Sequence, residues 1–570
     1  FGTRVPLTAS LTGTGAQTEE TAGQADVARA ISLPGASTVS AWAQRGHDAR
    51  FRFSAQVPDV LRELGREAVD DAGLRLLDRQ ARDEIADHEH GGGAVVVDLV
   101  VEDLDGVVRV HHHARAGRHG GDDVALGGEV VGVVAGAVIL ILIGLTVAGG
   151  RTVAVTTDEP AHVDMYNTYL ESGWYTTEVP SEADDVIADE KSYVLVYGPL
   201  VHEISHVIAV SLGIEESKRA SLNTGSQEVR RGVLAAMLVL GVIAMIWAGR
   251  IGTGRWSWGL LGGAFLVSIP VLSGSAMFNV KDLPAAMGLT VLITGLMTVF
   301  KSTRQRAWGT QAVASLAIAA GWTFTLGSRP ALALIVIGVV GIAILAGAVI
   351  LARTRGSATT ASPRTALASL FVGSALGYVL ILILYPKLFE QPISIILGSL
   401  NSASEFGWGG FTLMAGDRVS SQPGWSYIPL WVFAQTPLYL LAAAITGTTV
   451  MLIAWLTLVK RGELLSHVNA AYMLGATLWV AVTIGIPVAV IPTDPFLYNG
   501  LRQVLFLLPG LSFLALLGTW WVWCWLRESD RRLAATGLLT AAVIAGLVFP
   551  SVAQLRLFPY SYAAYNSAIA

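Results

Sequence analysis

The sequence is poor in cysteine and in charged residues. Only one of its 570 residues is a cysteine, Cys524, and only 14% are Asp, Glu, Lys or Arg. A single cysteine excludes an intrachain disulfide and a zinc site made of several thiolates. The 38 basic residues are outnumbered by 43 acidic ones. Because no basic surface of the kind that binds nucleic acid is indicated, we expect no nucleic-acid partner.

Apolar residues take the place of the missing charges. They make up 53% of the chain, and the mean hydropathy is +0.55. A helix needs about 20 apolar residues to cross the hydrocarbon core of a bilayer, and such runs recur after the first 128 residues. The sequence therefore predicts an all-α polytopic transmembrane helical bundle of about 11 spans. The predicted spans are 129–149, 232–249, 256–274, 285–300, 307–326, 331–352, 365–385, 430–458, 468–491, 501–526 and 533–550.

Residues 1–128 differ in composition from the rest of the chain. They are rich in Ala, Gly, Arg, Asp and His and show no sustained helical or strand period. We predict a poorly structured N-terminal extension over 1–128, followed by a transmembrane domain over 129–570. Our hypothesis for the contrast is a start codon assigned upstream of the true one. Two segments within this extension do show a pattern of regular structure. Val57 to Ala86 has some amphipathic helical character, and Ala94 to Val110 alternates like a strand.

Lysine and arginine gather in alternate short loops of the predicted bundle. By the positive-inside rule these loops are cytoplasmic, so the loops between them face outside a plasma membrane. The segment 197–213 is apolar but short, and we predict an amphipathic helix on the outer interface. A true span there would reverse every later loop. The basic loops contain Arg250 and Arg255; Lys301, Arg304 and Arg306; Arg353, Arg355 and Arg364; Lys460 and Arg461; and Arg527, Arg531 and Arg532.

An acidic pair closely follows the first predicted span. Asp158 and Glu159 precede Pro160, and the polar and apolar period that continues through His162 predicts a helix whose positive end lies at the two carboxylates. A carboxylate there can deprotonate a hydroxyl nucleophile, and the pair can help to hold a divalent cation. A helix cap at the membrane interface is the simpler alternative.

A second motif combines a Tyr-Gly-Pro-Leu sequence, which begins at Tyr197, with a zinc-binding pattern. His202, Glu203 and His206 match HExxH, in which two histidines bind zinc and the glutamate activates water. An intramembrane zinc metalloprotease is therefore an alternative function, and only in that alternative do His202 and His206 bind a metal. Such an enzyme needs a third ligand, for which Asn279 to Pro284 is a poor candidate.

Charged residues lie at the outer ends of two later spans. Lys281 and Asp282 stand where a bilayer penalises both, which indicates a site in which the lysine binds a phosphate. Pairing of the two with each other is the alternative. Arg502 enters the membrane from the outer side, where it can bind a lipid phosphate bidentately or extend to the headgroups. Aromatic side chains in the outer loops suit sugar stacking or an interfacial belt. The predicted substrate-binding residues are His162, Tyr197, Asp282, Trp425, Tyr427 and Tyr498.

In this order, the motifs resemble those of the GT-C glycosyltransferases that use polyprenyl-phosphate sugars. This group includes the glycosyltransferase family 39-like protein O-mannosyltransferases and the lipid A aminoarabinose transferase. The resemblance covers roughly 129–566, and the acidic pair is the most general mark of the group. Within a bacterial subgroup, a histidine would be expected at Gln503 and aliphatic residues at His202 and His206, so the sequence departs from the pattern there.

The resemblance implies a glycosyltransferase that moves a sugar from a polyprenyl-phosphate donor to an acceptor glycan, lipid or protein on the extracytoplasmic face. By analogy with the group, Asp158 is the general base of an inverting displacement, and Glu159 positions Asp158 or a metal ion. Lys281 and Arg502 bind the donor phosphate. The need for a divalent metal ion stays open.

A polytopic transporter or flippase is a third class of function for such a chain. It would be favoured by related repeats in the two halves and by helices broken near the midplane, and we find no such repeat. Geometry separates the enzyme alternatives. A glycosyltransferase brings Asp158, Lys281 and Arg502 to one outer cavity, whereas a protease gathers His202, His206 and a third ligand around one metal.

Overall fold

The computed structural model divides the chain into two compact units, Phe1–Asp123 and Val124–Ala570. It describes residues 29–30, 38–43, 48–54, 96–104, 107–115, 122–177, 179, 197–302, 308–353, 361–391, 395–399, 410–414, 416–461, 470–529 and 532–568.

The first unit contains one antiparallel sheet with strands in the order β1-β2-β3-β4-β5. Strands β4 and β5 overlap the segment whose alternating pattern predicted a strand. The predicted helix Val57 to Ala86 lies outside the described residues, and the mis-assigned start stays a prediction. The strands are β1 (Arg29–Ala30), β2 (Thr38–Ala43), β3 (Asp48–Ser54), β4 (Val96–Leu104) and β5 (Val107–Arg115).

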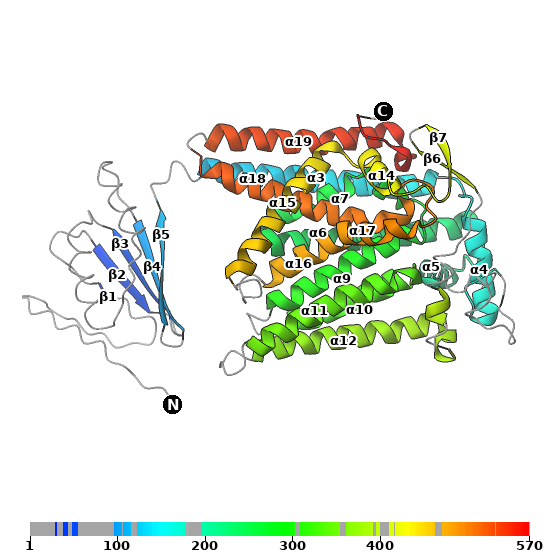
Figure 1. Ribbon diagram of the computed structural model, residues 1–570, viewed down its shortest axis with the longest axis horizontal. Helices are drawn as coiled ribbons and strands as arrows, with labels where there is room; N and C mark the ends of the chain where they lie inside the picture. Colours follow the sequence, from blue (N-terminus) through cyan, green and yellow to red (C-terminus); the bar gives the residue numbers. More distant parts are fainter. Residues whose placement is uncertain are drawn as a thin grey trace, which may run out of the picture. The chain divides into compact units, whose positions relative to one another are not determined.

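The second unit is a helical bundle (Figure 1). Its elements are α3 (Asp122–Thr152), which begins at the junction of the units, α4 (Glu159–Ser172), α5 (Leu200–Ser211), α6 (Thr224–Thr253), α7 (Trp256–Val267), α8 (Pro270–Ser275), α9 (Asp282–Ser302), α10 (Trp308–Leu326), η2 (Pro330–Leu332), α11 (Ala333–Arg353), α12 (Ala361–Leu384), η3 (Pro386–Phe389), β6 (Phe411–Met414), β7 (Asp417–Ser420), α14 (Tyr427–Gln435), α15 (Leu438–Arg461), α16 (Ala470–Val480), η4 (Ala481–Gly485), α17 (Ile486–Val490), η5 (Ile491–Thr493), η6 (Arg502–Leu507), α18 (Leu508–Arg527), α19 (Arg532–Leu557) and η7 (Ser561–Ala563).

The predicted polytopic helical bundle is confirmed. Within the described part of the chain, nine helical stretches are long and apolar enough to cross a membrane. They fall at nine of the eleven predicted spans. The other two positions are helical too. The helix α7 has only 12 residues, because the backbone becomes extended at Ile269, before Pro270 starts the next helix. The 19 residues of α10 include Gln311 and several hydroxyl side chains.

Among the membrane-length helices of the described residues, two are the most deeply buried. In its most apolar window α9 is 94% buried, and the stretch that contains α18 is 83% buried, whereas α15 is 17% buried. The peripheral helices expose apolar side chains, as lipid contact requires. Because α9 begins at Asp282 and η6, which leads into α18, begins at Arg502, two of the predicted site residues lie at the starts of these two stretches.

The helix α5 is too short to span a bilayer. Its 12 residues extend about 18 Å at 1.5 Å per residue, against about 30 Å of hydrocarbon. At its start, the Leu200 amide donates to the Gly327 carbonyl between α10 and η2 (3.1 Å). Beyond its end, Glu215 lies 3.9 Å from Arg230 in the second turn of α6. In Figure 1, α4 and α5 lie together at one end of the long helices.

Candidate functional site

Asp158 lies directly before α4 and does not cap it. Its side chain makes no capping hydrogen bond and is 38% exposed. One carboxylate oxygen, Oδ2, instead accepts from the Lys281 Nζ (3.3 Å) and from the Arg502 Nη2. The alternative that Asp158 serves only as a helix cap therefore lacks its hydrogen bond, and three of the predicted catalytic and phosphate-binding groups meet at one atom.

Asp282 is the most buried carboxylate of the same cluster. It is 4% exposed, and its carboxylate accepts from Asn279 Nδ2 (3.0 Å), from Arg502 Nε (3.3 Å) and from Arg329 Nε (2.6 Å) and Nη2. The Arg502 guanidinium thus contacts Asp282 through Nε and Asp158 through Nη2. The cluster joins the starts of α4, α9 and η6 to the connection between α10 and η2.

The turn before α9 is built by an asparagine. The side-chain oxygen of Asn279 accepts from the backbone amides of Lys281 (3.2 Å) and Asp282 (2.9 Å), a local pattern that Asn favours in turns. With these two amides bonded, the backbone of the turn is fixed. Lys281 and Asp282 therefore present their charges from a rigid turn.

A left-handed turn sets the position of Arg502. Asn499 and Gly500 have φ values of 59° and 67°, and a Cβ on Gly500 would meet the Gln435 Oε1 at 2.7 Å. That oxygen accepts from the Leu501 amide (3.0 Å), and the Tyr427 hydroxyl accepts from the Gly500 amide (2.9 Å). The positive φ and the close approach of Gln435 both favour glycine at this position. Tyr427, predicted to bind substrate, is 1% exposed and holds this turn.

The Tyr-Gly-Pro-Leu motif places an aromatic ring under the cluster. The Lys281 Nζ lies 3.9 Å from the centre of the Tyr197 ring, and the Arg329 guanidinium carbon lies 5.6 Å from it. A Cβ on Gly198 would collide with the Gly327 carbonyl, and the Gly198 amide donates to the Ser328 carbonyl (3.1 Å). Close backbone contact made possible by glycine therefore brings Tyr197 beneath two cations.

The cluster carries a formal excess of positive charge, with the three cations Lys281, Arg329 and Arg502 against the two carboxylates Asp158 and Asp282. Burial lowers the pKa of Lys281 to about 8, helped by the charge of Arg502. Burial opposes ionisation of Asp158, but the charges and hydrogen bonds of Lys281 and Arg502 outweigh it and lower its pKa to about 2. An anionic ligand would relieve the repulsion among the cations.

A small pocket opens beside Arg329 and Asp282. Gln503 completes its polar side. The rest of the lining is aliphatic or aromatic, and the volume of about 30 Å³ is that of a single water molecule. The apolar lining residues are Ala285, Ala331, Leu332, Leu505 and Phe506.

Glu159 points away from the cluster. It is 2% exposed, accepts from the Thr156 amide (2.6 Å) and lies 3.7 Å from Arg231 Nη2. Arg231 also donates to the carbonyls of Gly150 (2.8 Å) and Ala154 (3.2 Å), so this pair ties the end of α3 to α6. Because Asp158 and Glu159 face different cations, the pair does not fit a shared metal ion. Among the described residues, no three His, Cys, Asp or Glu side chains are arranged to hold one.

His162 lies one helical turn after Asp158 and is buried. Its Nδ1 is 3.1 Å from the Tyr175 hydroxyl, and its ring packs edge-on against Tyr197 at 5.2 Å. Burial, with the charge of Lys281 second, lowers its pKa to about 3, so the imidazole is neutral. His162 thus supports Tyr197 from behind rather than adding charge to the site.

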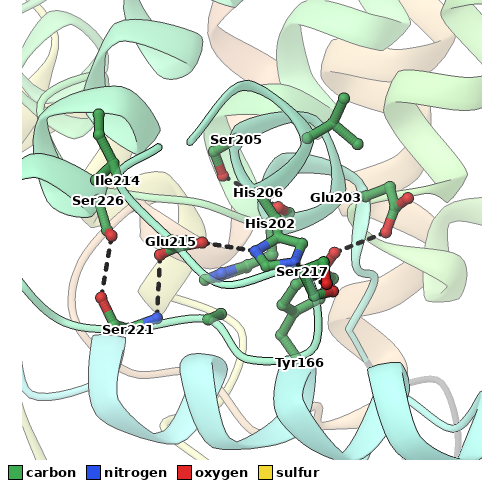
Figure 2. Close-up of polar contacts among 12 residues, drawn as sticks. Tyr166, His202, Glu203, Ser205, His206, Ile214, Glu215, Ser217, Ser221 and Ser226 are labelled. Carbon is green, nitrogen blue, oxygen red and sulfur yellow. Dashed lines mark hydrogen bonds and ion pairs between the residues drawn. The ribbon is translucent and has the colours of Figure 1, made fainter. Parts of the chain in front are cut away.

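The three side chains of the HExxH motif all contact Tyr166 of α4, and His206, whose ring lies 5.4 Å from the Tyr166 ring, has Glu215 as a second partner (Figure 2). His202 stacks against Tyr166 at 5.7 Å, Glu203 accepts from the Tyr166 hydroxyl (2.8 Å), and His206 Nδ1 lies 2.6 Å from Glu215. The motif therefore links α5 to α4 and to the segment before α6. Asn279, the start of the candidate third-ligand segment, is bonded to Asp282 instead.

The remaining predicted residues are Tyr498 and Trp425. Burial raises the pKa of Tyr498, and the positive charge of Arg329 opposes this rise. Trp425 is 73% exposed. Sequence reasoning missed Arg329, although the signal was present: it is the only charged residue between 308 and 352, which separates two apolar runs.

No protein-family model and no curated protein sequence matches the chain. Its structure is similar to the crystal structure of ArnT from Cupriavidus metallidurans bound to undecaprenyl phosphate, with a TM-score of 0.41 and 14% identity over 75% of this chain and 76% of that one. It is also similar to the archaeal oligosaccharyltransferase AglB from Archaeoglobus fulgidus in complex with an inhibitory peptide and a dolichol-phosphate, with a TM-score of 0.44 and 12% identity over 76% of this chain and 56% of that one. Both are polyprenyl-phosphate-dependent GT-C glycosyltransferases, the group that the sequence motifs resemble. At these TM-scores and identities, neither likeness assigns a function to this chain.

Proposed function

We propose that the chain is a membrane glycosyltransferase that moves a sugar from a polyprenyl-phosphate donor to an acceptor hydroxyl or amide on the extracytoplasmic face. The observation that carries the proposal is the convergence of a partly exposed carboxylate, Asp158, with Lys281 and Arg502 at one end of a membrane bundle. A base beside two cations is what transfer from a phosphate leaving group requires.

Each group has a part in the displacement. Asp158 takes the proton of the acceptor as its oxygen or nitrogen forms a bond to the anomeric carbon. The bond from that carbon to the phosphate oxygen breaks, and its electron pair leaves with the polyprenyl phosphate. Lys281 and Arg502 stabilise the charge that grows on the leaving phosphate. No step needs a metal ion, and the two acidic residues at 158 and 159 do not converge on one.

The placement of the site outside the cytoplasm is supported by the ends of the helices. α6, α9, α11 and η6 with α18 begin at the end of the bundle where the cluster lies. Their last turns, at the opposite end, contain Arg250, Lys301, Arg353 and Arg527. The positive-inside rule makes that opposite end cytoplasmic. A sugar donor at the outer face must then be carried by a lipid.

The direct test is a transfer assay with the purified protein. A panel of polyprenyl-phosphate sugars, each radiolabelled in the sugar, is mixed with the detergent-solubilised full chain and a membrane extract from its source as acceptor. We expect one donor to lose its label to the acceptor fraction and to release free polyprenyl phosphate. Failure of every donor in the panel would contradict the proposal, provided that the protein elutes as a folded species.

Donor capture should depend on pH through Lys281. Its pKa of about 8 means that the ammonium is charged below this pH and neutral above it. Because only the charged form attracts phosphate, kcat/KM should fall by up to about tenfold per pH unit above pH 8. Lys281→Arg, which keeps its charge at these pH values, should remove the decline. If kcat/KM of this variant still falls above pH 8 as in the native protein, another group titrates.

The glutamate of the HExxH motif should be dispensable for chemistry. Glu203→Gln keeps an acceptor for the Tyr166 hydroxyl, so transfer should stay within about threefold of the native rate, a difference of less than 1 kcal/mol. A zinc protease would lose its water-activating base in this variant. Measuring transfer and the cleavage of a casein substrate on the same preparations separates the two. Loss of transfer in Glu203→Gln with an unchanged melting temperature would contradict this prediction.

A further inference from the structure

Building on the proposed function, we propose that Asp158 occupies the phosphate-binding position of the donor-free enzyme and becomes available as a base only when the donor phosphate replaces it on Lys281 and Arg502. The donor must then bind before the acceptor can be activated. The protein's own carboxylate is thus a competitor of the donor, and the ligand class of the site is a phosphate ester carried by an apolar chain.

The contacts of Arg502 make such an exchange possible without moving the side chain. Its Nε bonds to the buried carboxylate of Asp282 (3.3 Å), while its Nη2 bonds to Asp158. Asp282 is itself held by Asn279 (3.0 Å). One edge of the guanidinium is therefore fixed, and the other faces a partly exposed partner that a ligand can displace.

Lys281 is held in the same way. Its Nζ sits 3.9 Å over the ring of Tyr197 and 3.3 Å from Asp158. The ring fixes the ammonium from one side, and the Asp158 carboxylate, 38% exposed, covers it from another. Both cations thus have one permanent partner and one shared, accessible partner. That shared partner is the same oxygen, Oδ2, so a single anion in its place would contact both cations.

The exchange also explains how Asp158 can serve as a base. While both cations hold it, its pKa of about 2 makes it a weak proton acceptor. A phosphate that takes the place of Oδ2 on the two cations removes the interactions that keep this pKa low, so the carboxylate gains basicity as the donor is seated. An acceptor hydroxyl that arrives before the donor therefore meets no effective base.

Binding of a polyprenyl monophosphate to detergent-solubilised full chain tests the competition, without need of the donor sugar or the acceptor. At pH 6.5, where Lys281 is charged, the native protein should bind the lipid phosphate, and Asp158→Asn should bind it about tenfold more tightly because the competing charge is gone. Asp158→Ser removes the same charge with a different side chain and should show the same gain. Inorganic phosphate and unphosphorylated polyprenol, as separate probes, should each bind more weakly than the lipid phosphate.

Asp164→Asn is the matched control, since it removes an exposed carboxylate from the same helix and should leave the affinity unchanged. If the native protein binds the lipid phosphate and both Asp158 variants bind it equally or less tightly, the competition is overturned while the proposed function stands. If neither the native protein nor the variants bind it, the proposed function fails as well. If inorganic phosphate binds as well as the lipid phosphate, the site takes free phosphate and the lipid class is overturned.

Discussion

Asp158→Asn should lower the rate of sugar transfer by about 10²- to 10⁴-fold, the usual contribution of a positioned general base. The amide is nearly the same size as the carboxylate and still accepts a hydrogen bond, so Lys281 and Arg502 keep a neutral partner. It cannot take a proton from the acceptor. Because Asp158 is 38% exposed and does not cap α4, membrane expression and the melting temperature should change little. Initial rates with saturating labelled donor measure the effect.

The size of this effect separates a base from a mere charge partner. Asp164→Asn, on the exposed side of α4, should retain the native rate. Combined with the binding experiment, Asp158→Asn should show an unusual pair of properties, tighter binding of the lipid phosphate and almost no transfer. Transfer at more than about a tenth of the native rate would remove Asp158 from the role of base, since a factor of ten corresponds to only about 1.4 kcal/mol of the barrier.

The membrane fold could be predicted because it follows from composition. Apolar runs of the length of a bilayer have one solution, a helix, and within the described residues nine of the eleven predicted spans are helices long and apolar enough to cross a membrane. The charged residues predicted at the ends of these apolar runs were also informative. Asp158, Lys281 and Arg502 attracted attention because charges are costly near lipid, and the structure brings the three together from positions up to 344 residues apart.

The partners of each charge could not be predicted from the sequence. Lys281 and Asp282 are neighbours in the chain, so a pair between them was a natural alternative, but Lys281 bonds to Asp158 while Asp282 bonds to Arg329 and Arg502. At the start of a helix, adjacent side chains point to different neighbours. The HExxH motif shows the same limit. Helical spacing places its two histidines one turn apart, and only tertiary packing shows that both rings pack against Tyr166 and that, among the described residues, no third ligand joins them.

Asp282→Ala should destabilise the protein by about 3–5 kcal/mol, the usual cost of removing one partner from a buried charge cluster. Asp282 is the 4% exposed carboxylate that keeps Arg329 and Arg502 side by side. Without it, two guanidinium groups face each other in a largely dehydrated position. Arg502 would also lose the contact that fixes its Nε, so donor binding should weaken even at temperatures where the variant is folded. Thermal unfolding in detergent and lipid-phosphate binding measure the two effects.

A second substitution shows whether repulsion between the arginines is the cause. Arg329→Ala, added to Asp282→Ala, removes one of the stranded charges and should recover part of the lost stability, so the double variant should melt at a higher temperature than Asp282→Ala alone. Asp164→Ala, at an exposed carboxylate of α4, should melt close to the native protein. The single variant Arg329→Ala completes the comparison. If the losses of stability of Asp282→Ala and Arg329→Ala simply add in the double variant, Arg329 and Asp282 act independently, and the buried carboxylate is not what holds the cations at the site. If they do not add, the same buried pairing that stabilises the bundle end also orients Arg502 toward the donor.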